Sequence, residues 1–364
     1  MDALNKIINQ GDQLIDPNSR SYDFAVSLGT ACIVSNKMEK NNLRLFSGPF
    51  DWIVGSPERV NYLIRNDFKD FFRHNNLEIE GKKDGKFLVR DKLNGLLSVH
   101  DFQASKDKIL VDEHKKVMDK YNRRIKKFYN WSKLSEKALF IIFINSEEDF
   151  SEAYGIKEAI SLCFPQLHFD LLVVHLSTEK ISKIKYMDDN LYLAYIYHDE
   201  NDWSKSDLHW KNVLNHFNID FSKKTIEISG TLPLNKNRLD FKNPENNNKF
   251  VYLGLSHHET HGRWSIGDKT RIGLRLETKP KKMVVKCTSY MNRSSLVYAN
   301  GKCIGSLDFT NNNHLNEFDM KDIDVENHYL IVDFIHETPI SPLSEGKSSD
   351  SRMISVLFNE ILFQ

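Results

Sequence analysis

The stretch Phe24-Ala25-Val26-Ser27-Leu28-Gly29-Thr30-Ala31-Cys32 joins an apolar run to a glycine turn and a cysteine. The run, residues 24–28, predicts a buried strand, and residues 31–40 predict the helix that follows. A cysteine at a helix start lies near the positive end of the helix dipole and near unpaired N–H groups, which favour its thiolate. The position also suits a small thiol packed under the turn. Cys32 is therefore a candidate nucleophile, with packing as the alternative.

Helices and strands alternate along the chain up to residue 235. Further helices are expected at residues 60–72, 106–130, 151–163 and 206–217, and further strands at residues 138–144, 171–176 and 191–197. This alternation is typical of helices that cover a sheet. Residues 1–235 are therefore expected to form an α/β domain, with a papain-like or Rossmann-like layered arrangement.

An asparagine-rich segment, residues 236–249, is polar and without apolar periodicity, which is typical of a linker. After it come short β-branched and aromatic runs, at residues 250–255, 271–277, 283–289, 296–299, 302–309, 329–335 and 354–363. Asn300-Gly301, between two of these runs, predicts a type I′ hairpin. Residues 250–364 are therefore expected to form an antiparallel, jelly-roll-like β-sandwich.

The composition excludes several classes of partner. The chain has 364 residues, 50 basic against 50 acidic residues and 40% apolar residues. Zero net charge gives no long-range field to hold a polyanion, so nucleic acid is not expected as a partner. The longest apolar run, residues 138–144, is far shorter than the roughly 20 residues that a transmembrane helix needs. Residues 1–4 do not resemble the start of a signal peptide, so a cytoplasmic location is expected.

No metal or cofactor is expected. The four cysteines lie at irregular spacings without a CxxC motif, at Cys32, Cys163, Cys287 and Cys303. This spacing argues against a zinc site and a disulfide framework, and fits a reducing compartment. The His-His-Glu-Thr-His segment at residues 257–261 lacks the helical H-E-x-x-H arrangement of a zinc enzyme.

One histidine and two acids stand in two further segments. Ser98-Val99-His100-Asp101-Phe102 sets an imidazole beside a carboxylate on an expected strand, where neighbouring side chains point to opposite faces. Ser47-Gly48-Pro49-Phe50-Asp51-Trp52 sets a carboxylate between two large aromatics. In a purely structural interpretation, His100 is a polar surface residue, Asp101 stabilises a turn and Asp51 stabilises a bend. In the functional interpretation, these three residues lie around Cys32, and Trp52 forms a wall for the substrate.

Together these segments resemble a known family. The pattern S-L-G-x-x-C, then S-x-P-F-D-W, then H-D-F, over about residues 22–145, is similar to that of papain-like cysteine peptidases described as a domain of unknown function. The resemblance implies Cys32 as nucleophile, His100 as general base, and Asp101 or Asp51 as the acid that orients the base. Such a site performs acyl transfer, and water, an amine or a sugar hydroxyl all remain open as the acceptor.

The expected helix at 106–130 carries a run of basic residues that includes Arg123 and Arg124. Two adjacent guanidinium groups could bind a phosphate or a carboxylate-bearing sugar. A basic run on a long helix is also typical of a solvated face, and Glu113 and Asp119 interrupt this one. Both interpretations stay open.

The C-terminal region carries a second resemblance. Gly262-Arg263-Trp264-Ser265, Asn300-Gly301 and the stretch from Ser341 to Arg352 are similar to the accessory β-domain attached to bacterial glycosyltransferases and other surface-polysaccharide proteins. The resemblance implies Trp264, Asp350 and Arg352 as glycan contacts. In the alternative, Asp350 and Arg352 form a salt bridge that closes the sandwich.

Three functions follow from these patterns. The first is thiol-dependent acyl transfer or hydrolysis on a bacterial surface polysaccharide, such as a capsule or O-antigen, or on its precursor. The second is a glycosyl or other group transferase that uses activated sugars and Arg123-Arg124, with a structural Cys32. The third is a non-catalytic glycan-binding assembly protein. The first predicts that iodoacetamide alkylates Cys32 before the other cysteines at neutral pH.

Overall fold

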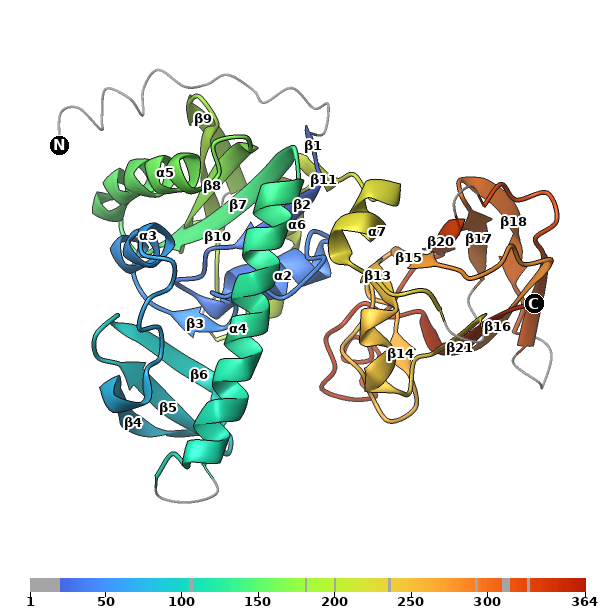
Figure 1. Cartoon of the computed structure of the whole chain (residues 1–364), viewed down its shortest axis with the longest axis horizontal. Helices are drawn as coiled ribbons and strands as arrows, with labels where there is room; N and C mark the ends of the chain where they lie inside the picture. The colour runs from blue at the N-terminus through green and yellow to red at the C-terminus, as the bar shows by residue number, and fades with distance from the viewer. Residues whose placement is uncertain are drawn as a thin grey trace. The chain divides into compact units, whose positions relative to one another are not determined.

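The structure is a computed structural model that describes residues 20–104, 108–180, 182–199, 201–234, 237–291, 294–309, 315–325 and 328–364. Residues 1–4, from which no signal peptide is expected, lie outside the described residues, as do residues 106–107 of one expected helix. The chain forms two compact units (Figure 1). The first comprises the residues up to Met38 and Phe46–Ile219, and the second comprises Glu39–Leu45 and Asp220–Gln364.

The main sheet of the first unit has the order β2-β7-β8-β10-β9. Its first four strands are parallel and β9 is antiparallel to β10. The parallel strands are almost wholly apolar, as expected of a sheet that is covered on its faces. The strands are β2 (Phe24–Ser27), β7 (Lys137–Ile144), β8 (His168–Ser177), β9 (Ser182–Asp188) and β10 (Leu191–Tyr197).

A second sheet in this unit is antiparallel, with the order β3-β6-β5-β4. Its strands are β3 (Ile53–Val54), β4 (Leu77–Lys83), β5 (Lys86–Asp91) and β6 (Leu96–Gln103). The long helix α4 (Val111–Leu134) runs beside β6 (Figure 1). The other elements are β1 (Arg20–Tyr22), α2 (Cys32–Lys40), α3 (Pro57–Arg65), α5 (Ser151–Cys163), α6 (Asp207–Leu214) and β11 (Phe217–Ile219).

Two helices differ from the sequence-based expectation. The helix expected at residues 60–72 ends at Arg65, because the next residues turn through left-handed backbone at Asp67, Phe68, Asp70 and Phe72. The buried carboxylate of Asp91 accepts the Phe72 N–H at 2.7 Å and so holds this turn from outside the segment. Helix α4 continues to Leu134 because Trp131 and Phe128 are buried and pack on strands β2 and β7 of the main sheet.

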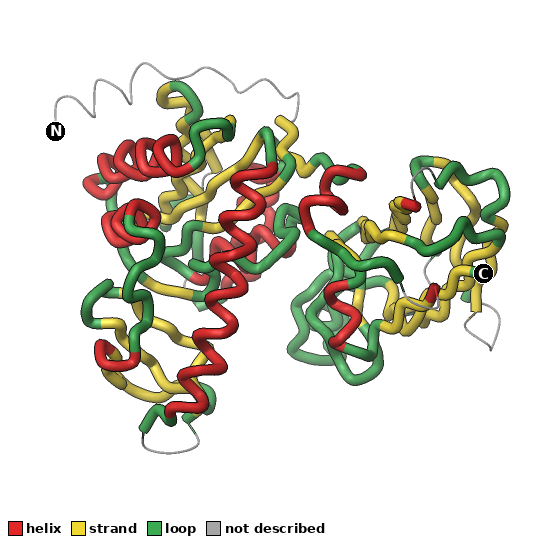
Figure 2. The backbone as a smooth tube through the Cα atoms, viewed as in Figure 1, coloured by secondary structure: helices red, strands yellow, loops and turns green. Residues whose placement is uncertain are grey.

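The strands of the second unit pair antiparallel in two sheets, and Figure 2 shows them in yellow among loops and short helices. One sheet has the order β12-β21-β16-β19 with β14 also paired to β21, and the other has the order β13-β15-β20-β17-β18. The strands are β12 (Arg238–Asp240), β13 (Phe250–Leu253), β14 (Arg263–Trp264), β15 (Lys269–Arg275), β16 (Lys282–Ser289), β17 (Ser295–Ala299), β18 (Lys302–Leu307), β19 (Leu315–Asp319), β20 (Tyr329–His336) and β21 (Val356–Phe363).

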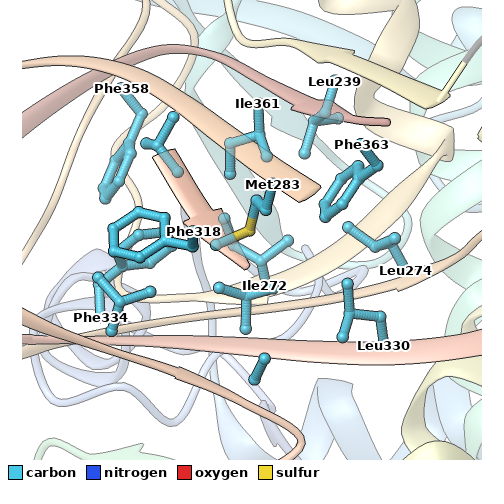
Figure 3. Close-up of a cluster of buried hydrophobic side chains, with 14 of the residues drawn as sticks. Leu239, Ile272, Leu274, Met283, Phe318, Leu330, Phe334, Phe358, Ile361 and Phe363 are labelled. Atoms are coloured by element: carbon cyan, nitrogen blue, oxygen red, sulfur yellow. The ribbon is translucent and has the colours of Figure 1, made fainter. Parts of the chain in front are cut away.

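Both sheets contribute side chains to one hydrophobic core. Figure 3 shows Met283, Phe358 and Ile361 from one sheet together with Ile272 and Phe334 from the other. Buried and exposed positions alternate along β19 and along part of β15, so one face of each sheet enters the core. The expectation of an α/β region followed by a β-rich region is confirmed.

The second unit begins earlier than the expected boundary at residues 236–249. Helix α7 (Lys223–Ser229) packs on β15, where Ile226 and Phe221 cover the bare backbone of Gly273. Within the expected linker, β12 adds to the sheet by pairing with β21. The polar composition of this segment did not indicate a strand, because only Leu239 is buried and its two neighbours are polar.

Among the described helices, none is apolar enough over 18 residues to cross a bilayer.

Candidate active site

The candidate nucleophile lies at the carboxyl end of β2. The chain leaves the strand through Gly29 and Thr30, which adopt φ of 77° and 67°. The Ser27 hydroxyl accepts the Gly29 N–H at 3.0 Å, and the Thr30 hydroxyl donates to the Phe143 carbonyl on β7. Helix α2 then begins at Cys32, which is buried. The turn therefore sets the thiol at an edge of a parallel sheet where open α/β folds commonly place ligands.

The segment at residues 47–52 packs directly against this turn. The carboxylate of Asp51 accepts the Gly48 N–H at 3.1 Å and the Ser35 hydroxyl at 2.9 Å, so it ties its own bend to helix α2. Asp51 is 1% exposed. Trp52 is left-handed, with φ of 67°, and its ring meets the His100 ring edge-on at 5.6 Å between centroids. The motif thus joins the cysteine turn to the histidine strand.

His100 and Asp101 lie in an irregular part of β6. Phe102 pairs with Phe87 and Ser98 pairs with Val89, so three residues of β6 face one residue of β5. This bulge breaks the regular alternation of faces. Asp101 consequently turns back to accept the Ser98 hydroxyl at 2.9 Å, although the two residues are three apart. His100 is exposed, whereas the side chain of Asp101 is only 5% exposed.

Helix α4 supplies two partners for Asp101 that the motif analysis missed. The Lys120 ammonium and the Tyr121 hydroxyl both donate to the Asp101 carboxylate. Burial raises the pKa of Asp101, but Lys120 and the three hydrogen bonds outweigh burial, so the pKa lies below its ordinary value. Tyr121 stands on the buried stripe of the helix with Val117 and Phe128, and this periodicity was the available signal.

The arginine pair divides between two faces of the same helix, because adjacent residues lie about 100° apart around a helix axis. Arg124 points inward: its guanidinium donates to the Asp51 carbonyl at 3.4 Å and lies 5.6 Å from the centre of the Tyr121 ring. Arg123 is exposed. The structure therefore brings Arg124 to the candidate site and leaves Arg123 on the surface.

The Cys32 thiol is poorly ionised. Burial raises its pKa to about 11, with the negative charges of Asp101 and Asp51 adding to the effect and the backbone N–H at the helix start opposing it. This reverses the expectation that the helix start favours the thiolate. Burial lowers the pKa of His100, with Asp101 partly opposing. At neutral pH Cys32 is therefore a neutral thiol and His100 a neutral imidazole.

Alkylation with iodoacetamide tests this resting state. Because the thiolate is the reactive form and its pKa is raised, Cys32 should react slowly at pH 7, after the exposed Cys303, and faster as the pH approaches 11. Asp101→Asn removes a charge that raises the pKa of the thiol, so its alkylation profile should shift to lower pH. Peptide mass spectrometry across a pH series measures both profiles, and fast labelling of wild-type Cys32 at pH 7 would contradict the expectation.

The residues singled out in the second unit form two groups. The Trp264 ring is partly exposed and meets Tyr290 edge-on at 6.1 Å. The Arg352 guanidinium binds Asp350 through two nitrogens, at 3.0 and 2.7 Å, and Glu259 at 2.7 Å. Asp350 and Arg352 thus form the ion pair of the packing alternative, although each side chain keeps 25% exposure.

The histidine-rich segment gives no metal site in the part of the chain that the structure describes. There, no three His, Cys, Asp or Glu side chains stand together as a metal site would require. Within the segment, Glu259 forms an ion pair with Arg352, and the His258 imidazole donates a hydrogen bond to the Lys242 carbonyl.

The chain is similar to known proteins over parts of its length. An uncharacterized protein, R408 of Acanthamoeba polyphaga mimivirus, is 23% identical over 215 residues, which cover 52% of this chain and 96% of that protein. An acetyl xylan esterase from the rumen bacterium Butyrivibrio proteoclasticus has a TM-score of 0.25 at 12% identity, over 35% of this chain and 32% of its own. A carbohydrate-binding module, solved with calcium and xylotriose, has a TM-score of 0.22 at 13% identity, over 35% of this chain and 98% of its own.

The family resemblance expected from the motifs is confirmed over part of the chain, whereas the link of the C-terminal region to polysaccharide proteins stays a prediction. The matching segment carries β2, the cysteine turn, the Trp52 segment, β6 and α4. Residues 23–179, less than half of the chain, match the family described as "Putative papain-like cysteine peptidase (DUF1796)".

Proposed function

We propose that the chain is a thiol-dependent hydrolase or acyltransferase in which Cys32 is the nucleophile and His100 the general base. The observation that carries the proposal is the meeting of three sequence-distant segments. The cysteine turn packs on the segment that ends in Trp52, Trp52 contacts His100, and the charge of Asp101 acts on both Cys32 and His100. The family match over residues 23–179 supports the same chemistry.

In this mechanism the neutral His100 takes the proton of the Cys32 thiol as sulfur attacks the carbonyl carbon of an ester. The C–O bond breaks, His100 returns the proton to the leaving alcohol, and a thioester remains on Cys32. Water or another acceptor then attacks the thioester, giving the product and restoring the thiol. Backbone N–H groups at the start of α2 stabilise the oxyanion.

The surrounding residues have separate roles in the proposal. Asp101 orients and polarises His100, and Lys120 and Tyr121 keep Asp101 in place. Asp51 holds the bend that presents Trp52, and Trp52 forms a wall for the substrate. Arg124 binds an anionic part of the substrate, and Arg123 makes an outer contact at most.

The second unit is proposed to be a jelly-roll-like sandwich that binds glycan. Its support is the partly exposed pair Trp264 and Tyr290 and the nearby resemblance of sequence. A surface polysaccharide of bacteria, or its precursor, is then the substrate class. Aromatic rings bind sugars by covering their apolar faces, and one exposed ring contributes about 1 kcal/mol.

Trp264→Ala is expected to weaken association with an authentic surface glycan about fivefold, while turnover of a small ester stays unchanged. Titration calorimetry with the glycan measures the first effect and an ester assay the second. A fall in melting temperature of several degrees would instead assign the ring to the core, and the glycan role would be withdrawn.

The test of the catalytic proposal is whether turnover of an activated acyl ester requires Cys32, with Cys303→Ala as the matched control. Retained turnover without the thiol would favour the group-transfer function that uses Arg124.

A further inference from the structure

A cavity of about 430 Å³ opens between helix α4 and the left-handed turn that follows α3. It shares no lining residue with the candidate active site. Its volume lies in the range of pockets that hold small ligands. We infer that this cavity is a second binding site, which takes a small organic oxyanion: a carboxylate or phosphate group carried on an apolar body.

The wall of the cavity is rigidly built by buried polar groups. Four residues of the turn, Asp67, Phe68, Asp70 and Phe72, have φ between 47° and 58°, and non-glycine residues adopt such values at a cost. Asn94, fully buried, donates to the Asp70 carbonyl at 3.2 Å. The surrounding structure therefore imposes this backbone.

The same buried network fixes the turn from a second side. Asp91 accepts the Phe72 N–H at 2.7 Å and the Asn94 amide at 2.8 Å, and is itself fully buried. On the helix side, the His114 imidazole donates through Nε2 to the Phe72 carbonyl at 2.9 Å. A wall held in this way is pre-organised, which lowers the entropic cost of binding.

The lining has an apolar part and a part that suits an anion. Phe68, Phe71, Met118 and Ile125 supply the apolar surface. Arg73 and His74 supply donors, and the His114 ring, whose Nε2 already donates to the Phe72 carbonyl, meets the His74 ring edge to face at 5.0 Å. A guanidinium beside an imidazole donor matches a carboxylate or a phosphate, and the apolar surface matches the group that carries it.

Asp70 is the acid that competes with such a ligand. Its carboxylate lies 3.3 Å from the Arg73 guanidinium, and the two side chains are 33% and 64% exposed. Exposed ion pairs are weak, so an incoming oxyanion can displace Asp70 from Arg73 at little cost. Asp70 therefore lowers the affinity of the cavity for an anion without blocking the cavity.

The proposal is tested by ligand-observed NMR titration of the full chain with four probes: phenyl phosphate, benzoate, inorganic phosphate and benzyl alcohol. Phenyl phosphate or benzoate should bind with a millimolar Kd or tighter. Inorganic phosphate lacks the apolar body and benzyl alcohol lacks the charge, so each should bind at least about tenfold more weakly. Whichever of the first two binds more tightly identifies the phosphate ester or the carboxylic acid as the source of the oxyanion.

Two variants and a control make the assignment specific. Arg73→Gln should weaken the better probe about tenfold, because a charge-assisted hydrogen bond is lost. Asp70→Asn should tighten it about threefold, because Arg73 loses its competitor; asparagine also tolerates the left-handed backbone at this position. Arg59→Gln, on a similarly exposed pair with Glu58, should bind like wild type. The proposal is overturned if neither anionic probe binds, if benzyl alcohol binds as well as benzoate, or if Arg73→Gln leaves affinity unchanged.

Discussion

Cys32→Ala is expected to lower turnover of p-nitrophenyl acetate by about a thousandfold or more, because no thioester forms without the sulfur. The loss is larger than that of a binding residue because the whole covalent route disappears. The substitution trims one small buried atom at a helix start, and alanine is a good helix former, so the fold should persist. Release of p-nitrophenol measures the rate, and intact-mass spectrometry detects the acyl-enzyme in the wild type.

Cys303→Ala is the matched control, since it also removes one thiol but from an exposed strand of the second unit. Its turnover should equal that of the wild type. If Cys32→Ala kept full activity, the nucleophile would be assigned wrongly. Far-ultraviolet circular dichroism of each variant separates loss of chemistry from loss of fold.

Gly29→Ala is expected to destabilise the first unit by about 3 kcal/mol or more. The glycine has a φ of 77°, which an alanine adopts at a cost of roughly 1–2 kcal/mol. In addition, an added Cβ would lie 2.8 Å from both the carbonyl oxygen and the Cβ of Phe50. The carbonyl belongs to the backbone of the Trp52 segment, so the clash cannot be relieved by rotating a side chain. Relieving the clash would therefore separate the cysteine turn from the segment at residues 47–52.

Gly85→Ala provides the comparison, because this hairpin glycine has a φ of 74° and open space where a Cβ would stand. It should lose only the backbone contribution, roughly 1–2 kcal/mol. Four of the five tryptophans lie in the first unit, so urea unfolding followed by tryptophan fluorescence reports chiefly on that unit. Equal losses in the two variants would show that the contact with Phe50 does not matter.

The sequence by itself determined the elements whose signal is local. The continuous apolar run at residues 138–144 could only be a buried strand or a buried helix, and its short length decided for a strand. Asn300-Gly301 marked a hairpin because both turn residues tolerate positive φ, and both adopt it at 44° and 79°. The motifs around Cys32, Trp52 and His100 were equally legible, since each is a short run of unusual residues.

The tertiary structure decided what depends on contacts between distant residues. Helix α3 ends at Arg65 because Asp91, on strand β5, accepts a hydrogen bond from the turn that follows the helix. The raised pKa of Cys32 follows from burial and from two acids that come from other segments, and these outweigh the backbone hydrogen bond at the helix start. Asp101 binds its partners on α4 because a bulge in β6 interrupts the regular alternation of side chains along the strand. Local propensity acts over a few neighbouring residues, whereas desolvation, charge and register act through space, so only the folded chain could decide them.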